Sequence, residues 1–157
     1  MNVADPLELK LSSDPGELCD VRAAIRDWIE QRGWEAHEIA DIVLAIDEAL
    51  TNVIRHGYGG RPGQPILVRV AVVQRGDRGE GVEIRIRDFG RQVPLDKIAG
   101  RDLDDLRPGG LGVHIIRNVM DESEYRHMHD GGTELIMRRY RGRCQTDHEG
   151  PTEPGRP

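Results

Sequence analysis

Two polar residues on one predicted helix have the spacing to share a ligand. Glu48 and Asn52 are four positions apart in a strongly helical stretch that runs from about Ala36 to Arg55. Residues at this spacing project from the same helix face. A carboxylate can act as a general base or orient a hydroxyl, and an amide oxygen is a neutral ligand for a hard cation such as Mg²⁺. The alternative for this pair alone is an ordinary solvated helix face.

A second candidate group lies where an alternating strand ends. Asp88-Phe89-Gly90 follows the strand pattern of Val82 to Arg87 directly. A carboxylate there lies where the chain changes direction, and Gly90 would let a flat ligand approach the backbone. The alternative is an ordinary strand-ending turn. Protein kinases share this tripeptide, but their Arg-Asp-Leu element precedes it, whereas Arg101-Asp102-Leu103 follows it here, so that assignment is excluded.

A third candidate is the glycine-rich segment that enters the third predicted helix. Gly110-Leu111-Gly112 follows Arg107-Pro108-Gly109 and opens a helix that continues to Val119. Backbone N–H groups and the positive end of a helix can hold phosphates without a lysine. Neither of the two lysines, Lys10 and Lys97, follows a glycine-rich loop, which excludes a Walker A site. The alternative for this segment is a flexible hinge.

Other polar residues favour plain structural roles. His127 and His129 alternate on a predicted strand, but no cysteine or carboxylate pattern supports a metal site, so solvent-facing histidines are favoured. For His56, at the end of the second predicted helix, capping is favoured over catalysis. The acidic residues 102, 104 and 105 are most simply part of a solvated loop, and partner recognition is the alternative.

Length, composition and charge exclude several classes of protein. The 157 residues suit one globular domain, and only 4% of them are aromatic, so Leu, Ile and Val must fill most of the core. A net charge of −6 without a basic stripe argues against a nucleic-acid partner. No apolar run reaches membrane-spanning length, and the first ten residues lack a signal-peptide pattern, so we expect a cytoplasmic protein with no membrane contact.

The order of predicted elements indicates the fold class. A strand (7–11) is followed by two helices (14–33 and 36–55) and a hairpin (66–74 with 82–87). A long polar connection (94–109), a third helix (110–119) and a last hairpin (123–128 with 133–140) complete the order. This order predicts an α+β fold, a two-layer α/β sandwich with a mixed, mainly antiparallel sheet and helices on one face. Residues 1–140 form the expected domain, and 141–157 the expected disordered tail.

The three candidate groups together are more specific than any one of them. Helical E-x-x-x-N, strand-end D-x-G and G-x-G at a helix entry, in this order, resemble the N, G1 and G2 boxes of the Bergerat, or GHKL, ATP-binding fold. That superfamily includes gyrase, the MutL repair proteins and the sensor histidine kinases. Glu48 to Tyr58, Gly109 to Ile116 and Met120 to Glu122 are most similar to the anti-sigma-factor serine kinases of bacterial partner-switching systems. The resemblance extends to about Arg139.

This resemblance implies ATP and Mg²⁺ as cofactors and assigns roles to the candidate residues. Asn52 is implied to bind Mg²⁺ and Glu48 to act as base for the attacking hydroxyl. Asp88, with Gly90 beside it, is implied to accept a hydrogen bond from the adenine amino group. The phosphate-binding residues implied are Gly110, Leu111 and Gly112, with 101–109 as a mobile lid, and Thr133 matches a hydroxyl residue near adenine.

The resemblance has one departure and leaves alternatives open. The fuller G1 pattern is D-x-G-x-G, and Gln92 occupies the second glycine position, as small members of this family often allow. The implied partners are a sigma factor and a small antagonist protein, bound by a homodimer. The alternatives are a non-catalytic, nucleotide-dependent binding module and the detached catalytic domain of a histidine kinase. The intact Glu48 and Asn52 favour a kinase over the module, and the short lid and the lack of a phosphoacceptor helix pair disfavour the third possibility.

Overall fold

One antiparallel sheet organises the molecule. The computed structural model describes residues 5–95 and 111–142, with five strands in the order β1-β2-β3-β5-β4. The strands are β1 (Leu7–Ser12), β2 (Pro65–Arg75), β3 (Gly79–Asp88), β4 (Glu122–His127) and β5 (Thr133–Tyr140). All four pairings within this described part are antiparallel. The predicted hairpins are therefore confirmed, and the sheet formed by these five strands is wholly antiparallel.

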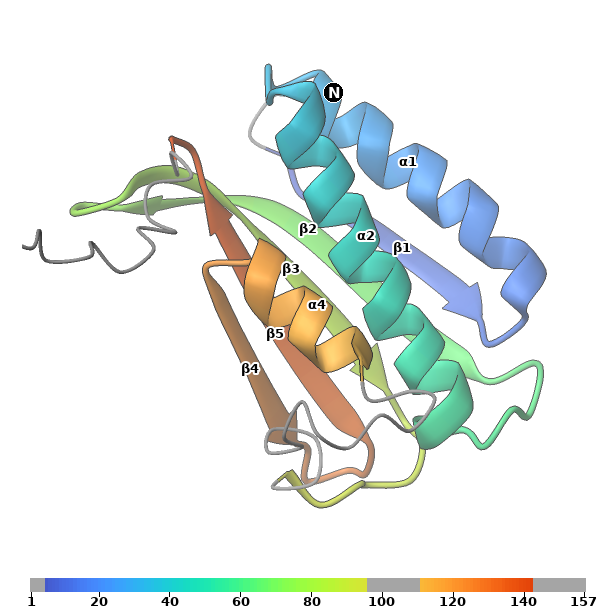
Figure 1. The fold of residues 1–157 in the computed structure, drawn as a ribbon. Helices are drawn as coiled ribbons and strands as arrows, with labels where there is room; N and C mark the ends of the chain where they lie inside the picture. The colour runs from blue at the N-terminus through green and yellow to red at the C-terminus, as the bar shows by residue number, and fades with distance from the viewer. Residues whose placement is uncertain (1–4, 96–110, 143–157) are drawn as a thin grey trace, which may run out of the picture.

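Helices cover one face of this sheet. They are α1 (Leu18–Glu30), α2 (Ala36–Asn52) and α4 (Leu111–Val119), with a 3-10 turn, η1 (Pro15–Glu17), before α1. Figure 1 shows α2 lying between α1 and α4 over the sheet. The predicted α+β sandwich with helices on one face is confirmed. Residues 1–4, 96–110 and 143–157 lie outside the described part, and with them the predicted lid and nearly all of the predicted tail.

Alternating side chains build the core between the two layers. Along β2, Ile66, Val68 and Val70 face the helices and are at most 2% exposed. Ile42, Ile46 and other apolar residues of α2 pack on the same core. Branched aliphatic residues thus fill most of the core, as the low aromatic content predicts, and Trp28, Trp34 and Tyr58 contribute aromatic rings.

The second helix ends earlier than its sequence pattern predicts. Its α-helical part begins with a capping box of Glu35 and Glu38 and ends at Asn52. A π turn, η2 (Val53–Gly57), follows, closed by a hydrogen bond from the Tyr58 N–H to the Val53 carbonyl at 2.9 Å. The wider turn brings Tyr58 into the core, where the residue is 3% exposed. Helical periodicity alone does not signal such a tertiary anchor.

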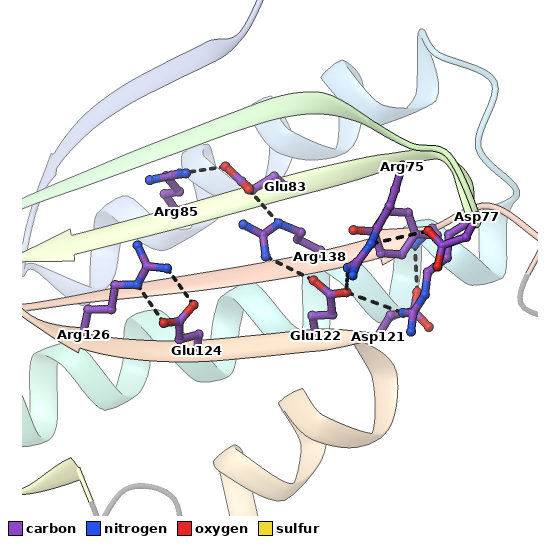
Figure 2. A network of polar contacts seen from close by, with 11 residues as sticks. Arg75, Asp77, Glu83, Arg85, Asp121, Glu122, Glu124, Arg126 and Arg138 are labelled. Carbon is purple, nitrogen blue, oxygen red and sulfur yellow. Dashed lines mark hydrogen bonds and ion pairs between the residues drawn. The ribbon is translucent and has the colours of Figure 1, made fainter.

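The opposite face of the sheet is covered by paired charges (Figure 2). Glu83 accepts hydrogen bonds from both Arg85 and Arg138, and Arg138 also bonds Glu122. Burial opposes ionisation of Glu83, but the two arginines outweigh it and lower the pKa of this carboxyl. Ile136 lies on this face between cross-strand neighbours and is only 1% exposed. The charged side chains therefore shield an apolar residue where no helix of the described part covers the sheet.

Candidate functional site

Asp88 is the buried centre of the candidate site. It is the last residue of β3, and its side chain points to the helix-covered face, as those of Ile84 and Ile86 do. The residue is 5% exposed. Its Oδ1 accepts the Gly90 N–H at 2.9 Å, and the backbone N–H of Thr133 also donates to the carboxylate. Burial raises the pKa of Asp88, and these donors and the Arg87 charge oppose the rise.

Thr133 lies beside Asp88 because of the strand register. The pairing of Arg87 with Glu134 between β3 and β5 places Asp88 opposite Thr133 at the next step. Thr133 is the first residue of β5 and is 8% exposed. The structure thus brings together two predicted site residues that are 45 positions apart in the chain, by the numbering of the sequence.

Three backbone segments meet around Asp88 at glycines. A Cβ on Gly90 would lie 2.3 Å from the Gly57 carbonyl oxygen, and a Cβ on Gly132 would lie 2.1 Å from the Asp88 carbonyl oxygen. The Arg91 N–H donates to the Gly57 carbonyl at 2.8 Å. Gly90 therefore allows close approach of the turn after α2, which the sequence did not predict. Contact of Gly90 with a flat ligand stays a prediction.

Tyr58 fixes the loop after β3 and was not found by sequence reasoning. Its hydroxyl donates to the Pro65 carbonyl at 2.6 Å and accepts the Phe89 N–H at 2.8 Å. Burial is the main cause that raises the pKa of Tyr58. The signal available in the sequence was an aromatic residue directly after a predicted helix end, which by itself indicates only core packing.

Glu48 and Asn52 lie on the side of α2 that faces α4 and β5. Asp41, seven residues before Glu48 and so on the same helix face, is paired with Arg139 of β5 at 3.4 Å. Asp47, by contrast, pairs with Arg22 of α1 at 2.8 Å. Glu48 and Asn52 are both half-buried, and Asn52 is the last residue of α2 before the turn that reaches Asp88. The two residues therefore share a helix face, as predicted.

Oxygen donors of this kind fit Mg²⁺ held jointly with phosphates. The ion usually takes one or two protein oxygens and completes its shell with water and phosphate. Asn52, at the end of α2, offers an amide oxygen of this kind, and Glu48, the expected base, lies on the same helix face. Within residues 5–95 and 111–142 there is no group of three or more His, Cys, Asp or Glu that could hold a metal. The donor set fits a metal that arrives with a nucleotide.

The third predicted group is described in part. Leu111 and Gly112 are the first described residues of α4, which confirms a helix at the end of the glycine-rich segment. Gly110 lies outside the described residues. Arg139 donates to the Val119 carbonyl at the other end of α4 while it pairs with Asp41. This buried arginine joins α4 to α2.

The two histidines of the last hairpin are exposed. His127 Nε2 lies 2.8 Å from the Val93 carbonyl oxygen, so its ring contacts the loop after β3. His129 is exposed in the turn between β4 and β5. Their predicted surface positions are confirmed, and His127 has a structural contact that its spacing did not indicate.

Comparison with known proteins identifies the family. The family profile described as the histidine kinase-like ATPase domain matches residues 11–139. The chain belongs to this family. Asp88, Thr133 and the Glu48/Asn52 face all fall within the matched range. In the part of the chain that the structure describes, no helix is long and apolar enough to cross a membrane.

Curated relatives in this family are named serine-protein kinase RsbW. The chain is 27% identical to RsbW of Bacillus pumilus over 153 residues, which is 92% of this chain and 91% of the relative. It is 26% identical to RsbW of Bacillus subtilis over 156 residues, with 94% and 93% coverage. The similarity therefore extends over the length of both chains.

Solved structures share the fold. One holds the RsbU and RsbW domains of a Mycobacterium tuberculosis protein, with a TM-score of 0.59 and 24% identity over 87% of this chain and 32% of that chain. This chain thus spans about a third of that larger protein. Another is the SiaB–SiaC complex from Pseudomonas aeruginosa, with a TM-score of 0.56 and 18% identity over 83% of this chain and 88% of that chain. At these identities the likeness concerns the fold.

Proposed function

We propose that this protein is an ATP-dependent serine/threonine kinase that acts as an anti-sigma regulator. In one state it sequesters a sigma factor, and in the other it phosphorylates a small antagonist protein. The observation that carries the proposal is the buried Asp88 carboxylate, held by the backbone of Gly90 and Thr133 beside the end of α2. Similarity to serine-protein kinase RsbW over the length of the chain supports the same function.

The proposed roles follow the chemistry of each side chain. Asp88 is an acceptor in a buried setting, which suits selection of the adenine amino group by a hydrogen bond. Asn52 would hold Mg²⁺, which when bound neutralises phosphate charge. Glu48 would orient or deprotonate the attacking hydroxyl of the antagonist. Gly110, Leu111 and Gly112 would place backbone N–H groups of the α4 entry against the phosphates, and Thr133 would lie near adenine.

The partners and assembly belong to the same proposal. We propose a cytoplasmic homodimer that binds a sigma factor and an antagonist protein, as the family resemblance implies, and similarity to serine-protein kinase RsbW supports the kinase part of this proposal. Residues 1–140 would form the ATP-binding domain, with 141–157 as a tail. Light scattering tests the dimer, because a monomer at micromolar concentration would contradict it.

The experiment that tests the activity gives the two helix residues different tasks. Wild type, Glu48→Gln and Asn52→Ala are compared for transfer of labelled γ-phosphate from ATP to the cognate antagonist. Glu48→Gln should lower transfer by roughly 10²- to 10⁴-fold while ATP binding survives. Asn52→Ala should impair metal-dependent ATP binding and transfer together. Asp47→Asn is the matched control, because Asp47 precedes Glu48 but faces Arg22 of α1.

Each outcome decides between kinase and binding module. Undiminished transfer by Glu48→Gln would remove Glu48 from the mechanism. If wild type binds ATP and a verified antagonist but transfers no phosphate, the protein is a nucleotide-dependent binding module. A loss in Asp47→Asn as large as that in Glu48→Gln would show that the effect is not specific to the helix face toward α4.

A further inference from the structure

Gln92 occupies the second glycine position of the longer G1 pattern and makes two hydrogen bonds there. Its amide Nε2 donates to the Met128 carbonyl at 2.9 Å and to the Gly132 carbonyl at 3.0 Å. These carbonyls lie on opposite sides of the turn between β4 and β5. A glycine at position 92 has no side chain with which to make either bond.

The two carbonyls form the neck of that turn. His127 and Thr133 are the last paired residues of β4 and β5, and Met128 and Gly132 are the next residues inward. Two backbone bonds span this turn: the Met128 N–H donates to the Gly132 carbonyl at 3.1 Å, and the Gly131 N–H donates to the Met128 carbonyl at 3.1 Å. The Gln92 amide adds a bridge from the Met128 side to the Gly132 side, so it closes the neck from outside.

The residues after the neck hold Asp88. The Thr133 backbone N–H donates to the Asp88 carboxylate. Gly132 has a φ of +72° and lies so close that an added Cβ would be 2.1 Å from the Asp88 carbonyl oxygen. A change in the width of the neck therefore moves a hydrogen-bond donor of the Asp88 carboxylate.

Further side chains join the same loop and the same turn. Arg87 donates to the Asp130 carboxylate at 2.6 Å and to the Gly131 carbonyl at 2.7 Å. His127 contacts the Val93 carbonyl at 2.8 Å. Gln92 differs from both because it alone reaches the two sides of the neck. Gln92 therefore limits the width of the turn and also holds the loop after β3 against it.

We propose that Gln92 is a positioning residue that closes the neck of the β4–β5 turn and thereby fixes Thr133 against Asp88. Its effect on nucleotide binding rests on the proposed function. Its effect on the turn does not, so the two consequences can be measured separately.

The experiment compares Gln92→Met with Gln92→Lys in the full chain. Methionine keeps the length and neutrality of the side chain but removes both donors, whereas a lysine ammonium keeps donors within reach. Amide hydrogen exchange of Gly90 and Thr133 is measured by NMR without nucleotide. Gln92→Met should speed both on the order of 10-fold, as expected for loss of about one net hydrogen bond, and Gln92→Lys should restore slow exchange.

Controls separate a local effect from loss of the fold. Gln64→Met is matched, because the Gln64 amide donates to the Pro62 carbonyl at 3.3 Å in a distant turn. The exchange of Ile84, in the middle of β3, reports global stability and should not change in any variant. Equal exchange of Gly90 and Thr133 in wild type and Gln92→Met would overturn the proposal. So would a Gln92→Lys variant that exchanges as fast as Gln92→Met.

Titration with ATP then separates the role of Gln92 in the turn from the proposed function. If wild type binds ATP, Gln92→Met should lower the affinity for ATP by about the factor by which it speeds amide exchange. Gln64→Met should bind ATP with the affinity of wild type. If wild type binds no ATP while the exchange result holds, the proposed function fails and the role of Gln92 in the turn stands. If wild type binds ATP and Gln92→Met binds it equally well, the positioning role is refuted and the proposed function stands.

Discussion

Replacing Asp88 by asparagine changes the recognition group of the candidate site and almost nothing else. The side chain keeps its size and loses a charge. In the protein, the Gly90 and Thr133 backbone N–H groups both donate to the Asp88 carboxylate. An asparagine that retains those two bonds must use its only oxygen for them. Its NH₂ group then faces the remaining direction, where the carboxylate offers an acceptor.

The expected magnitude follows from that reversal. An adenine amino group would meet a donor in place of an acceptor, in a setting where Asp88 is 5% exposed. A buried donor left without its acceptor costs about 1–3 kcal/mol. The affinity for ATP should therefore fall by about 5- to 150-fold. GTP presents a carbonyl oxygen at the corresponding ring position, so GTP should gain relative to ATP.

Titration calorimetry with ATP and with GTP on the same preparations measures both affinities. Asp77→Asn is the matched control, because Asp77 makes the same carboxylate-to-amide change at an exposed hairpin where it pairs with Arg75. It should leave both affinities unchanged. Equal affinity of wild type for ATP and GTP would refute the assignment of Asp88, and so would an Asp88→Asn variant that keeps the ATP preference of wild type.

Stability measurements test the remaining contacts. Burial raises the pKa of Asp88 in the folded protein. The stability of wild type relative to Asp88→Asn should therefore be highest below the ordinary carboxyl pKa and should decline as pH rises through the raised pKa. A stability difference in urea unfolding that grows with pH would contradict this. Tyr58→Phe removes a hydroxyl with two backbone partners and should lower the free energy of unfolding by about 1–3 kcal/mol. Tyr125→Phe should be neutral or stabilising, because the buried Tyr125 hydroxyl has no partner among the described residues. Equal losses of stability in urea unfolding would refute this contrast. Gly131→Ala should lower the free energy of unfolding by about 1–2 kcal/mol, because the backbone of Gly131 is left-handed. Gly132→Ala should lower it more, because the added Cβ also meets the Asp88 carbonyl. A lower melting temperature for Gly131→Ala than for Gly132→Ala would contradict the close approach.

Periodic patterns in the sequence predicted the layers of the fold. Alternation over Val82 to Arg87 gave the correct strand and the correct inward face, because one side of that strand is buried under helices. The bounds of α2 were less predictable. Its α-helical part ends at Asn52 where the pattern continues to Arg55, since the burial of Tyr58 after a π turn is a tertiary effect.

The candidate site was predictable where chemistry depends on residue type at a fixed spacing. Glu48 and Asn52 share a helix face, and Asp88 is the last residue of its strand. The supporting contacts were not predictable in the same way. Tyr58 and Gln92 act through hydrogen bonds to backbone groups of distant segments, and such bonds leave no periodicity and require no particular partner residue.

The charge pairs on the open face of the sheet show the same limit. The sequence contains 22 basic and 28 acidic residues, which indicates a polar surface but not which charges pair. Strand register decides this, because it places Arg138 of β5 opposite both Glu83 of β3 and Glu122 of β4. The register is set by burial of the other face, so the pairing follows from the core.

The proposed adenine-nucleotide site is formed jointly by the turn after α2, the end of β3 and the start of β5. Backbone amide shifts of the full chain, followed by NMR during titration with Mg²⁺ and ATP, test it most directly. We expect saturable shifts at Gly57, Gly90 and Thr133, much smaller shifts with GTP, and little change at Arg22 or Asp27 of α1. No saturable shifts with ATP, or shifts confined to residues remote from Asp88, would contradict it.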